Sequence, residues 1–170
     1  FNVGVAGFAA IGAYTAAILS GPDWAGSIGG FGLPVGIAWA GAMVTSALAA
    51  SLVGGLTLRL RQDYLAIATF GIAVVIQLVA LNLEPVTGGA FGLASLPRPF
   101  AGDLESSSAR NLAFLAIAVA VLGVAWLLLE LLVRSPWGRV LRAIREDETA
   151  AQALGKSPFR FRLEAFVIGS

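Results

Sequence analysis

Few side chains in this sequence could carry out covalent or metal chemistry. The 170 residues contain no cysteine and no histidine. The chain therefore lacks thiol nucleophiles, imidazole bases, disulfides and the usual ligands of transition metals. We predict no catalytic residue and no metal site, and a protein that is not an enzyme.

One segment imitates a nucleotide-binding loop. Ala150–Ser157 reads AAQALGKS and ends in the Gly-Lys-Ser triplet of a P-loop. Ala150 replaces the first glycine of that motif, no strand is expected before it, and Pro158 follows where a helix should continue. A phosphate cradle needs free backbone amides at the start of a helix, whereas Gly155 stands where a helix should end. We therefore predict that this chain itself binds no nucleotide and no other cofactor.

The charged segment Ser135–Gly155, SPWGRVLRAIREDETAAQALG, is the most distinctive part of the chain. Ser135 can cap a helix, Pro136 suits the first helical position, and Gly155 suits the position after a helix end. The acidic run Glu146–Glu148 favours a new helix start, so we predict two short helices with a bend near Glu146. Physical reasoning leaves two interpretations open, which are an amphipathic segment whose basic residues face anionic lipid and a docking surface for a partner.

The elements around this segment are apolar. The chain is 58% hydrophobic and 12% charged, whereas about a quarter of a soluble domain is charged. A helix of about 20 apolar residues crosses a bilayer. The segments that reach or approach this length are Val3–Ser20, Pro34–Leu58, Tyr64–Leu83 and Leu112–Val133, and a fifth would start at Leu163. We predict an all-α, multi-pass membrane helix bundle of about four spans plus the start of a fifth, a single domain over residues 1–170 that is truncated at both ends.

The distribution of basic residues predicts the orientation of these spans. Nine of the eleven lysines and arginines follow the second or the fourth span, and only Arg98 and Arg110 lie between the third and the fourth. The positive-inside rule makes the side with nine basic residues cytoplasmic. Segment 134–162 is therefore expected inside and loop 84–111 outside. A net charge of +1 gives no reason to expect a nucleic-acid partner.

Small residues recur at every fourth position of the second span, at Ala38, Ala42, Ser46, Ala50 and Gly54. On a helix they form one ridge that allows another helix to approach closely. In the first span, the pair Ala6/Ala10 and the triplet Ala9/Ala13/Ala17 also recur at every fourth position, so a second ridge of small residues is predicted there. We interpret both ridges as helix packing rather than as a translocation path.

The outer loop contains the glycine-rich stretch Thr87–Leu93, TGGAFGL. Its backbone amides could bind an anion such as a carboxylate, or the stretch could be a flexible surface loop. The apolar residues Phe91, Leu93 and Leu96 suggest that the loop folds partly back onto the bundle.

Four stretches resemble one known family. They are Phe8–Tyr14 (FAAIGAY), Arg59–Thr69 (RLRQDYLAIAT), Thr87–Leu93, and Arg134–Gly155, which is similar to a cytosolic loop of the pattern RSPxGRxLRAIREDExAAxALG. In this order they resemble the membrane-spanning permease subunit of the branched-chain amino acid (high-affinity leucine/isoleucine/valine) ABC importers. The resemblance covers nearly the whole chain, and the last motif is highly specific.

The resemblance implies a permease of the bacterial or archaeal plasma (inner) membrane that carries branched-chain or related amino acids. It implies partners too: ATP-binding subunits that hold ATP and Mg, a second permease subunit, a periplasmic or extracellular substrate-binding protein, and the surrounding membrane lipid. Segment 134–162 would be the coupling loop that docks the ATPase. Its implied docking residues are Arg139, Leu141, Arg142, Ala143, Ile144, Arg145, Glu146, Asp147, Glu148, Ala150, Ala151, Ala153, Leu154 and Gly155. Substrate-path candidates are Tyr14, Thr69, Gln77, Thr87, Gly88 and Gly89.

The sequence also departs from the family pattern. Val5–Phe8 stands where members often carry a GHAAF-like run, Gln62 replaces a usual glycine, and Gln77 stands where many members carry a charge. These differences bear on the substrate, so a permease for urea or short amides stays open as the alternative. A secondary transporter is a weaker alternative because it would need ionisable groups inside the membrane.

Overall fold

The computed structural model describes residues 3–22, 30–60, 62–93, 96 and 107–170. All regular secondary structure in the described part is helical, in agreement with the predicted all-α class. The chain divides into two compact units, residues 1–97 with 163–170 and residues 98–162. Helix α8 spans the boundary between them.

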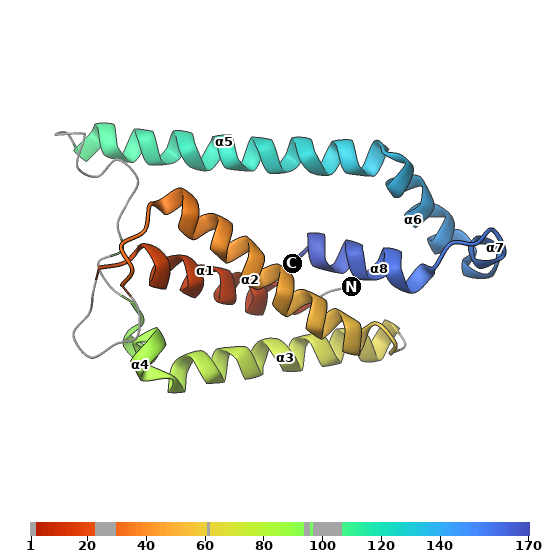
Figure 1. Cartoon of the computed structure of the whole chain (residues 1–170), viewed down its shortest axis with the longest axis horizontal. Helices are drawn as coiled ribbons and strands as arrows, with labels where there is room; N and C mark the ends of the chain where they lie inside the picture. The colour runs from red at the N-terminus through yellow and green to blue at the C-terminus, as the bar shows by residue number, and fades with distance from the viewer. Residues whose placement is uncertain (1–2, 23–29, 61, 94–95, 97–106) are drawn as a thin grey trace. The chain divides into compact units, whose positions relative to one another are not determined.

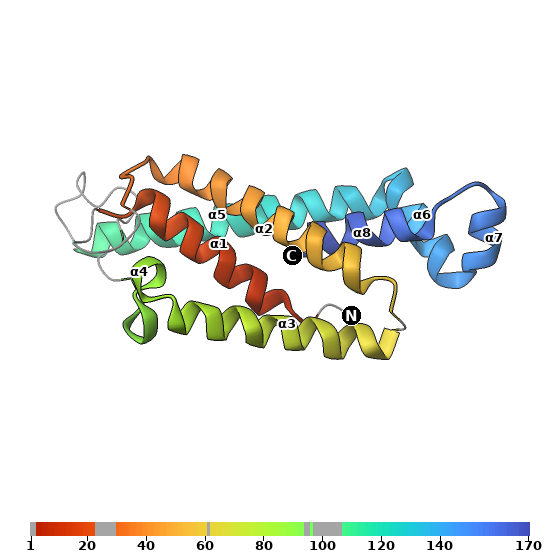
Figure 2. The same ribbon diagram turned by 60° about the horizontal axis from the view of Figure 1, so that its bottom comes forward.

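The first unit contains α1 (Val5–Ser20), α2 (Val35–Thr57) and α3 (Gln62–Asn82), followed by the short α4 (Glu84–Thr87) and the 3-10 turn η1 (Gly89–Phe91). Helix α1 packs against both α2 and α3, as Figures 1 and 2 show. The C-terminal part of α8 (Pro158–Ile168) belongs to this unit, where the Phe8 and Phe166 rings meet edge to face at 5.8 Å between their centroids. Phe8, Ala50 and Phe166 form the centre of the small core.

The predicted ridge on α2 is a packing surface. Ala38, Ala50 and Gly54 are buried. The Ser46 hydroxyl donates to the Phe8 carbonyl of α1 over 3.2 Å. The ridge prediction for α1 is only partly right, because Ala17 is buried whereas Ala6, Ala9 and Ala13 are exposed. In α1, the buried Gly7 provides the close approach instead, against Ala73 of α3.

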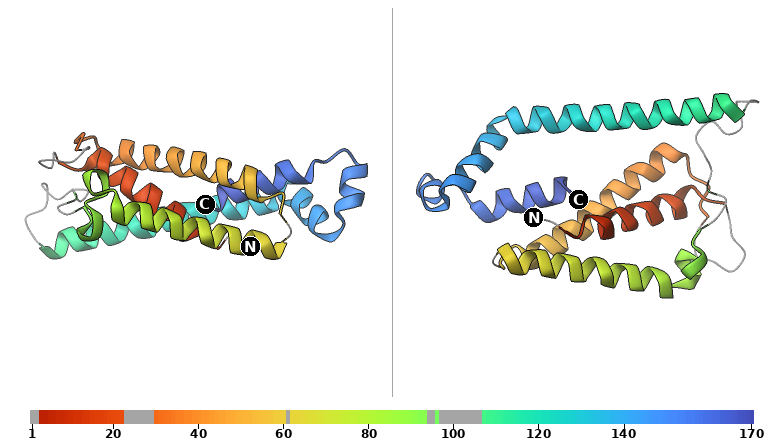
Figure 3. Two further views of the ribbon diagram at one scale, coloured as in Figure 1. Left: turned by 90° about the horizontal axis from the view of Figure 1, so that it is seen from below. Right: turned by 180° about the vertical axis from the view of Figure 1, so that it is seen from behind.

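The second unit contains α5 (Ser107–Arg134), α6 (Pro136–Glu146) and α7 (Glu148–Ala153). Figure 3 shows the chain turning at the end of α5 into α6 and turning again into α7. Helix α5 begins at Ser107, five residues before the predicted start at Leu112. The polar residues Ser108, Arg110 and Asn111 can be part of the helix because their side chains are exposed in its first turns. Residues 107–111 therefore belong to a helix, although we placed them in the outer loop.

Three helices are long and apolar enough to cross a membrane, among the residues that the structure describes. They are α2, residues Tyr64–Asn82 of α3, and residues Ser108–Arg134 of α5. Helix α1 is apolar but has only 16 residues. These helices agree with the predicted second, third and fourth spans, and the chain is a helical membrane domain.

Candidate functional site

The charged segment that follows α5 folds as the two short helices expected from its sequence. Ser135 is the N-cap of α6, and its side chain accepts a hydrogen bond from the Gly138 amide. Its hydroxyl also donates to the Leu132 carbonyl of α5 over 2.6 Å. Pro136 occupies the first turn, where a missing amide costs nothing. The predicted start of this helix is confirmed.

The corner between α5 and α6 is built closely. A Cβ atom added to Gly138 would overlap the backbone carbonyl of Val133. Arg142 closes the same corner, because its Nη2 atom donates to the Val133 oxygen over 3.3 Å. A cation at the end of a helix satisfies carbonyl groups that have no partner within the helix. The first two turns of α6 are thereby attached to the last turn of α5.

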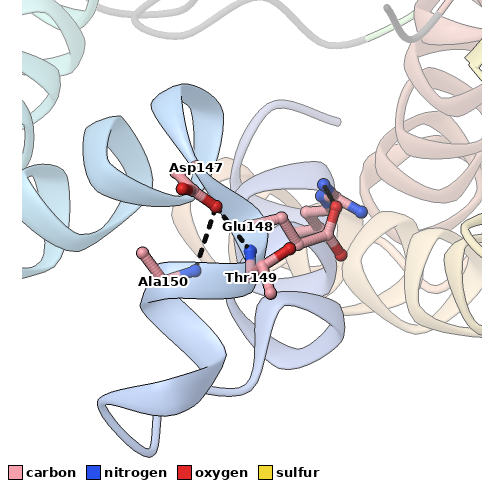
Figure 4. Close-up of polar contacts among 5 residues, drawn as sticks. Asp147, Glu148, Thr149 and Ala150 are labelled. Carbon is pink, nitrogen blue, oxygen red and sulfur yellow. Dashed lines mark hydrogen bonds and ion pairs between the residues drawn. The ribbon is translucent and has the colours of Figure 1, made fainter.

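The bend between α6 and α7 lies at Asp147, one residue beyond the predicted position. The backbone of Asp147 is extended, so it ends α6 and caps α7. Its Oδ1 atom accepts hydrogen bonds from the Thr149 amide over 2.9 Å and from the Ala150 amide over 3.0 Å (Figure 4). Asp147 therefore supplies the capping interaction that the acidic run predicted.

Gly155 ends α7 as expected. Its φ of 75° lies in the left-handed region. The amides of Gly155 and Lys156 donate to the carbonyls of Gln152 and Ala151 over 2.8 Å and 3.1 Å. Pro158 then starts α8, which begins five residues before the apolar run that we expected from Leu163. The charged residues before Leu163 are therefore part of the helix. Arg162 can be part of it because its side chain is exposed, where it pairs with Glu148 of α7 at 2.5 Å.

The predicted docking residues divide into an exposed and a buried set. Ile144 and Ala151 are each only 4% exposed, and the helices that carry them, α6 and α7, pack together. The resemblance implies both as docking residues, whereas in this chain both are buried in packing within the chain itself. Leu141 and Glu148 are half-buried. The exposed members are Arg139, Arg142, Ala143, Arg145, Glu146, Asp147, Ala150, Ala153, Leu154 and Gly155.

The substrate-path candidates do not meet in one place. Thr69 is buried in α3, where its hydroxyl oxygen accepts from the Val3 amide and donates to the Ala66 carbonyl. Thr87 is buried at the other end of α3, where its hydroxyl donates to the Ala80 carbonyl, about 16 Å from Thr69 along the helix axis at 1.5 Å per residue. Gln77 is exposed and Tyr14 is half-buried. The six residues therefore do not form a single site in this part of the chain.

The glycine-rich stretch is a compact turn. Thr87 Oγ1 donates to the carbonyls of Ala80 and Leu83 and accepts from the Gly89 amide. Gly88 and Gly89 have positive φ angles of 73° and 58°. The expectation that the loop folds partly back is right for η1, which packs against α3, and Leu93 is half-buried, but it is wrong for the exposed Phe91 and Leu96. The amide of Gly89 is occupied within the turn.

An open recess of about 400 Å³ lies in the first unit. It is lined by the exposed side of α1, by the middle of α2 and by the end of α8, and Gly12, Ser46 and Val167 are among its residues. None of the six path candidates lines it. Members of both predicted small-residue ridges line it, Ala9 and Ala13 from α1 and Ala42 and Ser46 from α2, so the spacing of small residues was the sequence signal that pointed to this surface.

Comparison with known proteins identifies the family. The model of the family described as "Branched-chain amino acid transport system / permease component" matches residues 1–170. The high-affinity branched-chain amino acid transport system permease protein LivM of Salmonella typhimurium is 34% identical over 99% of this chain and 43% of its own length. LivM of Escherichia coli gives the same values. A probable LivM of Methanocaldococcus jannaschii is 30% identical over 66% of this chain and 32% of its own length.

The chain spans less than half the length of these curated relatives. No solved structure matches it significantly. The family model nevertheless covers every residue. The chain therefore belongs to the family of permease components of branched-chain amino acid transport systems.

Proposed function

We propose that this chain forms part of the permease subunit of an ATP-driven importer for branched-chain amino acids, and that α7 with its flanking residues docks the ATP-binding subunit. The observation that supports docking most strongly is the shape of this element. Helix α7 is short, capped by Asp147 at its start and ended by Gly155, and it presents Leu154 with 80% of its surface exposed. An exposed apolar side chain beside ordered charges is the composition of a protein interface.

The proposed coupling follows from how α7 is attached to the membrane helices. On one side, α6 packs against α7 and joins α5 through the Gly138–Val133 corner. On the other side, Glu148 pairs with Arg162 at the start of α8. A displacement of α7 by the ATPase would therefore reach two membrane segments. Such a displacement can shift a bundle between two states only if the ATPase binds one of them better.

The lack of charged side chains in two of the spans supports a substrate path that does not couple transport to an ion. Residues 35–57 and 64–82 contain no acidic or basic side chain. Glu130 of α5 pairs with Arg134 one turn away, at 2.5 Å. A secondary transporter needs ionisable groups within the membrane to bind its coupling ion. We therefore favour a small amphipathic solute, and name leucine, isoleucine and valine because the relatives are transport permeases for branched-chain amino acids.

The direct test uses the full-length permease with its ATPases, second permease subunit and binding protein in proteoliposomes. We expect ATP-dependent uptake of labelled leucine, and expect disruption of Glu146–Glu148 to abolish it. Uptake of urea in place of leucine would redirect the substrate assignment while keeping the transporter class. Absence of uptake of either solute, with the ATPases demonstrably bound, would contradict the proposed substrates.

Gly155 offers a sharper test of coupling. A Cβ atom at Gly155 would meet no atom of this chain within 4 Å, so a substitution would disturb the described fold through the backbone. We expect Gly155→Val to uncouple ATP hydrolysis from uptake, because a β-branched residue disfavours φ of 75° by about 1–2 kcal/mol or more. Gly155→Asn is the matched control, since asparagine tolerates this region. Equal uptake per ATP in both variants would refute a role for this helix end in coupling.

A further inference from the structure

Helix α6 has an exposed cationic face. Arg139, Arg142 and Arg145 follow one another at intervals of three residues and are all exposed. The opposite face contains the buried Ile144 and the half-buried Val140 and Leu141. Helix α6 is therefore amphipathic, with one side packed within the chain and the other carrying three guanidinium groups.

This cationic face begins where α5 ends. The Nη2 atom of Arg142 lies 3.3 Å from the backbone oxygen of Val133, the last apolar residue of α5. If α5 crosses the membrane, the Arg142 guanidinium lies beside the end of its apolar segment. Arg139 and Arg145 lie on the adjacent turns of α6, so the three cations follow directly after that segment. Figure 3 shows α6 starting directly from the end of α5.

The charges of this face are not neutralised within the described part of the chain. Arg134 pairs with Glu130, and Arg162 pairs with Glu148. By contrast, Arg139 and Arg145 make no ion pair among the residues that the structure describes. Glu146 lies on the same exposed side at the end of α6, so the three arginines and this carboxylate leave two net positive charges.

We propose that Arg139, Arg142 and Arg145 bind the phosphodiester groups of anionic phospholipids in the membrane leaflet that surrounds this end of α5. Guanidinium groups bind phosphate oxygens in a planar, bidentate geometry. Each basic residue near an anionic bilayer surface adds to binding, and the effect depends on salt. The inference divides the charged segment between two partners: α6 contacts lipid, and the exposed part of α7 is left for protein. It requires the membrane placement of α5 but not the docking proposal.

The test measures lipid preference in the full-length permease without its ATPases. The protein is reconstituted in mixed vesicles of phosphatidylglycerol and phosphatidylcholine, extracted in mild detergent, and its bound lipids are quantified by mass spectrometry. We expect enrichment of phosphatidylglycerol, and expect Arg139→Gln/Arg145→Gln to lower this enrichment roughly tenfold, with the remaining preference lost in high salt. Arg139→Lys/Arg145→Lys should retain most of it, because the charge is kept.

The control removes the same charge elsewhere. Arg110→Gln/Lys156→Gln changes one exposed cation at the other end of α5 and one beyond α7, and we expect the enrichment to stay within twofold of the unmodified protein. Equal losses in the two double variants would overturn the proposal, since bulk charge would then explain the preference. Unchanged lipid enrichment together with weaker ATPase binding in Arg139→Gln/Arg145→Gln would also overturn it, and would assign the face to the protein partner.

Discussion

Helices α2 and α5 are both long enough to cross a membrane, yet they bury very different parts of their surface. Helix α2 buries Ala38, Ala50, Gly54 and Thr57, and its Ser46 hydroxyl bonds to the backbone of α1. In α5, none of the described residues is buried. The sequences differ accordingly: α2 has five small residues at successive fourth positions from Ala38 to Gly54, whereas no such run in α5 is longer than two.

The two units are consequently ordered by different interactions. In a bilayer, helices associate through close packing and interhelical hydrogen bonds, since lipid is as apolar as their side chains. The first unit uses both. In the second unit α6 and α7 also pack together, with Ile144 and Ala151 buried. Its corner and caps add Gly138 against Val133, Ser135 against Leu132, and the Asp147 cap of α7. Substitutions at these corners and caps should therefore act through backbone geometry and capping, whereas those on the helix faces of the first unit should act through packing.

The largest effect is expected at the α5–α6 corner. Gly138→Ala would place a Cβ against backbone atoms of Val133, which cannot move aside as a flexible side chain can. We expect a loss of about 3 kcal/mol, the upper end for overpacking, measured as a lower thermal denaturation midpoint of the full-length protein in detergent. Gly123→Ala in α5 is the matched control, because a Cβ there meets nothing within 4 Å. A similar midpoint for both variants would contradict the closely built corner.

Close packing in the first unit can be tested with two neighbouring glycines. A Cβ on Gly54 would lie 2.8 Å from Leu163 Cδ1 and 3.0 Å from Phe166 Cδ1, whereas one on Gly55 meets nothing within 4 Å. Because these obstacles are the ends of side chains, we expect Gly54→Ala to cost about 1–2 kcal/mol. Gly55→Ala should be neutral or slightly stabilising, since alanine favours helix. If both substitutions lower the denaturation midpoint equally, α8 does not pack on α2 as described.

Features set by local chemistry could be predicted from the sequence. Ser135, Pro136 and Gly155 occupy the cap positions expected of them, because capping depends on a few adjacent residues. The long apolar segments also became helices. The ends of these helices were less predictable. Helix α8 starts at Pro158, five residues before the apolar run. The helix includes the charged Arg162 because that side chain stays exposed and pairs with Glu148.

Features set by contacts between distant residues could not be predicted in this way. Spacing alone does not say which face of a helix is buried. Ala9 and Ala13 are exposed, whereas Gly7 on the same helix is buried against α3. Likewise, the resemblance implied that Ile144 and Ala151 are docking residues, but both are buried inside the chain. Of Ile144, Ala151 and Leu154, only Leu154 is exposed.

A smaller effect is expected from the cap at the bend. Asp147→Ala removes the acceptor of the Thr149 and Ala150 amides, and such a change typically costs about 1 kcal/mol. We expect faster hydrogen exchange at these two amides, while exchange in α5 stays unchanged. Glu146→Ala removes a neighbouring carboxylate that caps nothing in the described structure, and should leave both amides protected. Equal exchange in the two variants would show that charge, rather than the cap, orders α7.

The smallest effect is expected from the pair between Glu148 and Arg162, whose side chains are 44% and 43% exposed. Water screens a pair this exposed, so its coupling should be below about 1 kcal/mol. Glu148 also lies in the first turn of α7, where a negative charge is favourable without any partner. A double-mutant cycle of Glu148→Gln and Arg162→Gln separates the two contributions, because the helix-end contribution is lost in both Glu148 variants and cancels. We expect the coupling from denaturation midpoints to be small and to weaken with salt, while the single Glu148→Gln cost exceeds it. A coupling well above 1 kcal/mol would mean that this exposed ion pair makes a large contribution to stability. Capping and backbone geometry would then not be enough to explain how α7 is held in the second unit.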